Sequence, residues 1–119
     1  MRFVYSSSIT EGIGLGRITG QLQGLKIDFA TRVEDAEFLP VLFDFVRDEG
    51  LSLGGSSGIN IVGAMRLGKK LGPGKTIVTL LCDAGSRYVG RLYNADYLAA
   101  RNLPVPPWSG KAPHASIAK

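Results

Sequence analysis

The sequence has a single cysteine, a single histidine and few aromatic residues, which make up 8% of its 119 positions. One cysteine excludes a disulfide scaffold, and because glycine and proline follow no triplet period, a collagen-like chain is excluded as well. No apolar run approaches the roughly 20 residues that span a bilayer, and the N-terminus makes a poor signal peptide. We therefore expect a cytoplasmic protein with no membrane segment and no metal-binding cluster.

The remaining composition is that of one modest globular domain. Apolar residues make up 45% of the chain, the formal net charge is +4 and the sequence pI is about 9.5. The basic balance suggests nucleic-acid binding, but Lys111 and Lys119 lie in a tail without acidic residues, and the other basic residues are interspersed with acidic ones. The charge pattern therefore disfavours a nucleic-acid partner.

Hydrophobic patterning predicts a strand–helix–strand unit in the middle of the chain. Residues 51–53 are typical of a short strand, and residues 58–71 carry apolar positions at helical spacing. A glycine–proline–glycine sequence follows the helix, and residues 76–81 then form a continuous apolar run with β-branched members, which indicates a strand covered on both faces. This unit favours a parallel sheet and an α/β fold.

Shorter patterns flank this unit. Alternation of apolar and polar residues over 26–33 predicts a short strand. Helical spacing then begins at Asp35, which is expected to cap a helix that Gly50 closes in the left-handed conformation. Another short helix is expected at 94–101.

The end of the chain is rich in proline. We expect residues 1–103 to form the folded portion and residues 104–119 to form an extended, flexible tail, which Trp108 pins onto the body.

Two turns are candidate ligand sites. The turn Gly54-Gly55-Ser56-Ser57-Gly58 connects the first predicted strand to the helix, at the edge where open α/β sheets bind ligands. Its glycines allow close approach of a ligand, and its two hydroxyls either face that ligand or simply cap the helix. Asp83 follows the second predicted strand and is the other candidate. The adjacent Cys82 is expected to be a buried small hydrophobe rather than a nucleophile.

Four segments, in the same order and with similar spacings, strongly resemble cysteine synthase (O-acetylserine sulfhydrylase). They are residues 8–19, 49–60, 85–88 and 103–106, and the resemblance covers about residues 8–108. It implies the C-terminal portion of a fold type II enzyme that depends on pyridoxal phosphate, has a two-domain α/β fold and is usually a homodimer. Such enzymes replace the acetyl group of O-acetylserine with sulfide and so give cysteine.

The resemblance also implies cofactor contacts. In the family, the first serine of the glycine–serine turn binds the pyridine nitrogen of the cofactor, and this role carries over to Ser56. In some relatives the contact comes from the loop after the next strand, here Asp83 to Ser86, so the partner of the ring nitrogen stays open between Ser56 and Asp83. The segment that contains Gly12 resembles the family loop lining the cleft, which makes Gly12 a further candidate contact.

The family's Schiff-base lysine, its substrate-carboxylate loop and its phosphate cradle lie upstream of the matching segments. None of the lysines of this chain matches those motifs, so we expect no catalytic residue here and no activity without an N-terminal complement. Two alternatives remain: a non-catalytic regulatory partner that pairs with itself or with a full-length synthase, and an independent basic module that binds a ligand or nucleic acid.

Overall fold

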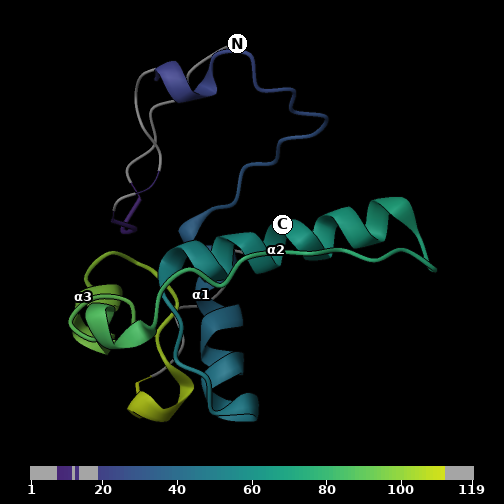
Figure 1. Cartoon of the computed structure of the whole chain (residues 1–119). Coiled ribbons are helices and arrows are strands. Elements are labelled where there is room, and N and C mark those ends of the chain that lie inside the picture. The colour runs from purple at the N-terminus through teal and green to yellow at the C-terminus, as the bar shows by residue number, and fades with distance from the viewer. Residues whose placement is uncertain (1–7, 12, 14–18, 112–119) are drawn as a thin grey trace.

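The computed structural model describes residues 8–11, 13 and 19–111, and within them the chain is built from helices and turns (Figure 1). The α-helices are α1 (Asp35–Asp44), which continues into a π-helical turn η2 (Phe45–Glu49), α2 (Gly55–Leu71) and α3 (Ala95–Ala99). Short 3-10 turns are η1 (Gly20–Leu22), η3 (Gly85–Tyr88) and η4 (Pro107–Ser109). None of the helices in these ranges is long and apolar enough to cross a membrane.

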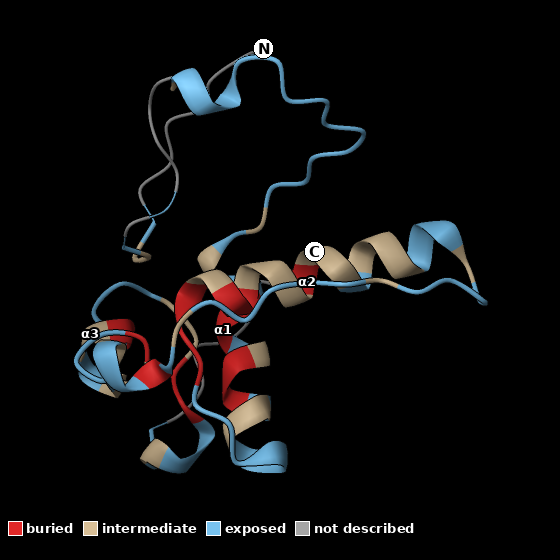
Figure 2. Ribbon diagram, in the orientation of Figure 1, coloured by how far each residue is buried: buried red, intermediate tan, exposed pale blue. Residues whose placement is uncertain are grey.

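The core lies where α1 meets the first half of α2, with α3 beside them (Figure 2). Gly58 allows the two long helices to approach closely, because a Cβ atom on it would lie 3.0 Å from side-chain atoms of both Leu42 and Phe38. The buried apolar residues are Phe38, Leu39, Leu42, Phe43, Leu53, Val62, Leu92, Leu98 and Val105. The core is therefore assembled by α1, the N-terminal half of α2 and the segment after η3.

The ends of the helices follow local chemistry with one correction. Gly50 and Gly72 end η2 and α2 with φ of 67° and 78°, as the sequence predicts. The cap of α1 is Glu34, not Asp35, which is the first helical residue. Asp35 does not cap because its carboxylate accepts hydrogen bonds from Ser8 and from the backbone of Ile9.

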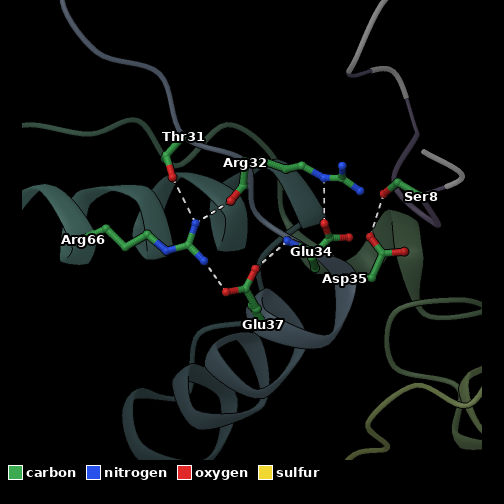
Figure 3. A network of polar contacts seen from close by, with 7 residues as sticks. All are labelled: Ser8, Thr31, Arg32, Glu34, Asp35, Glu37 and Arg66. Atoms are coloured by element: carbon green, nitrogen blue, oxygen red, sulfur yellow. Dashed lines mark hydrogen bonds and ion pairs between the residues drawn. The ribbon is translucent and has the colours of Figure 1, made fainter. Parts of the chain in front are cut away.

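An arginine on α2 fixes the segment that enters α1 (Figure 3). The guanidinium of Arg66 donates to Thr31 Oγ1 at 3.0 Å, to the carbonyl of Arg32 and to the carboxylate of Glu37. Glu37 in turn accepts a hydrogen bond from the backbone N–H of Glu34 at 2.7 Å. The start of α1 is therefore tied both to its own first turn and to the middle of α2.

The predicted strands are not formed within the described residues. Residues 76–81 run back alongside α2 (Figure 1). Ile77 is partly buried, but the other side chains of the run are exposed, with Val78 at 86% and Leu80 at 71% exposure. Residues 26–33 also lack strand pairing with any described residue. Within residues 8–11, 13 and 19–111, one bridge between extended segments is formed, and it joins Leu53 to Ala84 in antiparallel sense. A strand needs neighbours on its hydrogen-bonding edges, and the described residues supply none for residues 76–81. The parallel sheet stays a prediction.

The proline-rich segment lies against the core as far as it is described. Val105 and Pro106 are buried, and the ring of Trp108 meets that of Phe43 edge-on, with 5.8 Å between centroids. This contact places Trp108 where it pins the segment, as expected from the sequence.

Candidate functional site

The start of α2 and the turn that begins at Asp83 are joined by backbone hydrogen bonds. The N–H of Gly54 donates to the carbonyl of Asp83 at 2.8 Å, and the N–H of Gly85 donates to the carbonyl of Ser52 at 2.9 Å. These bonds flank the antiparallel bridge between Leu53 and Ala84. The two turns singled out from the sequence therefore lie side by side, although the pairing that joins them is antiparallel.

Two glycines at this junction serve close packing of the protein itself. A Cβ atom on Gly54 would lie 2.8 Å from Cε2 of Tyr88, and one on Gly55 would lie 2.7 Å from Cγ2 of Thr10. Both distances are shorter than a carbon–carbon contact, so any side chain here would displace its neighbour. The space beside each glycine is thus filled by protein, which differs from the expectation that it admits a ligand.

A cavity of about 590 Å³ opens beside this junction. Its lining residues are Glu11, Ile13, Ser56, Cys82, Asp83, Arg87 and Tyr88. The structure therefore brings both Ser56 and Asp83 to one cavity. The expectation for Cys82 was wrong: the side chain is exposed, because the run that precedes it is not covered. Gly12, the third candidate, lies outside the described residues.

The two serines of the turn have different surroundings. The N-cap of α2 is Gly54, which has no side chain to cap the helix, so the interpretation of the serines as the helix cap is wrong. Ser56 is half-buried and lines the cavity. Ser57 is fully buried, and its hydroxyl has no hydrogen-bond partner within the described part of the chain. Ser56 is therefore the serine of this turn that a ligand in the cavity can reach.

Tyr88 is a site residue that sequence reasoning missed. Its hydroxyl donates to Oδ2 of Asp83 at 2.5 Å. This hydrogen bond, then partial desolvation and the negative charge of Asp83, raise the pKa of the Tyr88 phenol above its ordinary value. The short turn η3 brings the two residues together, a contact that neither hydrophobic periodicity nor motif spacing signals.

The donor set suits a heteroaromatic ring more than a metal ion. No group of three or more histidine, cysteine, aspartate or glutamate side chains that could hold a metal ion occurs among the residues described. The cavity instead combines a hydroxyl in the first turn of a helix, an aromatic side chain and the two carboxylates of Glu11 and Asp83. A hydroxyl can donate to or accept from a ring nitrogen, so the hydroxyl of Ser56 is compatible with a nitrogen-containing ring in the cavity.

No family model matches the chain, whereas comparison with known proteins finds cysteine synthases and a cystathionine beta-synthase among its relatives. The chain is 45% identical to cysteine synthase 2 of Schizosaccharomyces pombe over 98 residues, which is 81% of this chain and 25% of that protein. It is 43% identical to cysteine synthase of Dictyostelium discoideum, over 82% of this chain and 26% of that protein. Cystathionine beta-synthase of the same organism is 33% identical over 85% of this chain and 20% of that protein.

The matched segment covers most of this chain but only a small part of each relative. The chain spans about a quarter of the length of the two cysteine synthases that it matches, whereas the match covers about four fifths of the chain. Over those four fifths the chain is similar in sequence to the cysteine synthases, and the match covers about a quarter of each of them.

Proposed function

We propose that this chain is the C-terminal part of the cofactor-binding domain of a cysteine synthase that depends on pyridoxal phosphate. The homology over about four fifths of the chain carries this proposal, and the cavity at the start of α2 supports it. Because the matched part is about a quarter of each relative, the activity belongs to an assembly that also contains the remaining part. The substrates of that assembly are O-acetylserine, or a close relative, and sulfide.

In this proposal Ser56 holds the pyridine nitrogen of the cofactor. When bound, pyridoxal phosphate supplies an electron-withdrawing ring that stabilises negative charge on the α-carbon of an amino acid. Ser56 lies in the first turn of α2, where free backbone N–H groups give the helix end a partial positive charge. A neutral hydroxyl at this end favours an unprotonated ring nitrogen, which suits elimination of a β-substituent more than chemistry that requires a protonated ring.

The contacts of Asp83 favour Ser56 over Asp83 as the nitrogen partner. The Asp83 carboxylate already accepts the O–H of Tyr88 at 2.5 Å. This hydrogen bond occupies Oδ2, so the carboxylate is already engaged by a donor of the protein itself. Asp83 then serves as a wall of the cavity. A contact from Gly12 stays a prediction that the family resemblance carries.

The exposed run at 76–81 indicates how the rest of the protein joins this chain. Val78 and Leu80 are largely exposed. The side-chain N–H of Asn60 donates a hydrogen bond to the carbonyl of Leu80 at 2.9 Å. An apolar extended segment without a strand partner is a ready template for β-pairing. The partner that fits is the remaining part of a cysteine synthase fold, in which residues 76–81 become a strand of the predicted parallel sheet, and the completed unit forms a homodimer.

Reconstitution tests the proposal. The chain is mixed with the part of the Schizosaccharomyces pombe relative that it does not match, and both association and cysteine formation from O-acetylserine and sulfide are measured. We expect turnover that neither part gives alone. Ser56→Ala should lower this turnover by about tenfold, the scale of one lost hydrogen bond. Ser109→Ala, a change of the same kind in η4, should leave it unchanged.

Other results would change the conclusion. Association without turnover would support a non-catalytic regulatory partner, and the absence of both would overturn the proposal. Reduction with borohydride in the presence of pyridoxal phosphate, followed by mass mapping, should find no single lysine of this chain modified stoichiometrically. A stoichiometric modification would mean that this chain itself supplies the covalent anchor.

A further inference from the structure

Asp35 makes long-range contacts that helix capping does not explain. Its Oδ1 accepts a hydrogen bond from Ser8 Oγ at 2.6 Å, and its Oδ2 accepts one from the backbone N–H of Ile9 at 2.9 Å (Figure 3 shows the first). Ser8 lies 27 residues earlier in the chain. Ser8 Oγ also accepts from the backbone N–H of Thr10 at 3.1 Å. Both carboxylate oxygens of Asp35 are thus engaged by one short segment.

The same segment is held at its other end by α2 and by the turn before α3. Thr10 packs against Gly55, the first residue of α2, because Cγ2 of Thr10 would lie 2.7 Å from a Cβ atom placed on Gly55. Glu11 forms an ion pair with Arg91, with 2.6 Å between Oε1 and Nη1. The residue after Gly55 is Ser56, which shares the cavity with Glu11 and Ile13. Residues 8–11 therefore connect the start of α1 to the cavity.

We propose that Asp35 is a positioning residue that fixes residues 8–11 as one wall of the cavity containing Ser56. The assignment of the cavity to the cofactor rests on the proposed function, whereas the positioning itself does not. Aspartate suits this role because a carboxylate offers two acceptor oxygens, one for the hydroxyl of Ser8 and one for the N–H of Ile9. Asparagine offers one acceptor oxygen and no charge, and its NH2 group can only donate to Ser8 Oγ, so the charged pair of acceptors is lost.

Amide hydrogen exchange on the 119-residue chain tests the first half of the proposal. We expect Asp35→Asn to speed exchange of the Ile9 amide by about tenfold, the scale of a lost hydrogen bond to a charged acceptor. Asp44→Asn, the same chemical change at the far end of α1, should leave that amide unaffected. Unchanged exchange at Ile9 in the Asp35 variant would overturn the proposal.

A purely helix-stabilising role of Asp35 gives a different pattern. Asp35 lies in the first turn of α1, where a negative charge favours the helix. If that were its main role, the amides of Leu39 and Leu42 would exchange faster together with that of Ile9, and the positioning role would fall. Ser8→Ala removes one bond of the contact and also the acceptor of the Thr10 N–H, so it should speed exchange at Ile9 and Thr10 and leave the amides of Leu39 and Leu42 unchanged. This second variant keeps the test decisive if Asp35→Asn does not fold.

A spin label tests whether the contact positions the wall of the cavity. Cys82 is the sole cysteine of the chain, is exposed and lines the same cavity as Glu11 and Ile13. A nitroxide on Cys82 should broaden the amide signals of both residues in the parent chain, and Asp35→Asn should reduce that broadening severalfold. Equal broadening in the two chains would overturn the proposal. Neither measurement uses pyridoxal phosphate, so its outcome is independent of the reconstitution experiment.

Discussion

The phenol of Tyr88 donates a hydrogen bond to the carboxylate of Asp83, with 2.5 Å between the two oxygens. The Tyr88 ring also covers Gly54, because a Cβ atom there would lie 2.8 Å from ring carbon Cε2. One side chain thus contacts both turns that line the cavity. The hydrogen bond ties the charge state of Tyr88 to the stability of this junction.

We expect this bond to make stability fall at alkaline pH. The hydrogen bond to Asp83 raises the pKa of Tyr88 above 10.0 in the folded chain, whereas in the unfolded chain it returns to about that value. A raised pKa contributes stability that is fully present below the unfolded value and is lost as pH rises through the folded value. Urea unfolding should therefore show Tyr88→Phe to be less stable than the parent at neutral pH, with the difference shrinking above pH 10. Tyr97→Phe serves as the control, and a constant difference at all pH values would contradict the assignment.

A matched pair of glycine substitutions on α2 tests the helix crossing. At Gly58 a Cβ atom would lie 3.0 Å from Leu42 Cγ and from Phe38 Cδ2, so Gly58→Ala should lower the free energy of unfolding by about 1–3 kcal/mol through overpacking. At Gly63 the nearest atom is Thr31 Cγ2 at 3.6 Å, an ordinary contact. Gly63→Ala should instead raise that free energy by about 0.5–1 kcal/mol through helix propensity. Denaturant unfolding of both variants measures the contrast, and equal effects would place the close crossing elsewhere.

Removal of the buried hydroxyl of Ser57 is expected not to destabilise the fold, unlike most substitutions of buried residues. The hydroxyl has no hydrogen-bond partner among the residues that the structure describes, and Ser57 is fully buried. An unsatisfied buried hydroxyl costs about 1–3 kcal/mol, so Ser57→Ala should leave the chain equally stable or stabilise it by about 1 kcal/mol. Thermal and urea unfolding test this expectation. A loss of more than about 1 kcal/mol would reveal a partner for the hydroxyl.

The contact between Glu37 and Arg66 should weaken in acid. The pKa of Glu37 is lowered, first by the backbone N–H of Glu34 and also by Arg66, against the opposing effect of desolvation. A lowered pKa contributes stability that is present above the unfolded value of about 4.5 and is lost as pH falls through the folded value. Glu37→Gln should therefore cost about 0.5–1 kcal/mol at neutral pH and less in acid, since both side chains are partly exposed. Urea unfolding at both pH values checks this, with Glu49→Gln as the control; a cost that persists in acid would argue against the ion pair.

Local sequence patterns were sufficient for the α-helices and their C-terminal ends, whereas the starts of α1 and α2 were displaced. Apolar spacing and the glycine–proline–glycine stop place α2, which begins three residues before the predicted range of 58–71 because its first turn runs through the glycine–serine motif. Asn94 caps α3 with its own side chain, which accepts from the N–H of Tyr97. These features depend on residues within a few positions of one another, so the sequence expresses them directly. The same holds for the motifs that carry the resemblance to cysteine synthases.

Contacts between distant residues decided the rest. The carboxylate of Asp35 accepts a hydrogen bond from Ser8, and the ring of Tyr88 packs against Gly54. Residues 76–81 have the composition of a buried strand, yet Val78 is exposed, because burial of a strand depends on neighbours that the run itself cannot supply. The sequence by itself determined the main helices and the similarity to cysteine synthases. The burial of each segment and the partners of each polar side chain followed instead from tertiary packing, because packing depends on groups that are far apart in the chain.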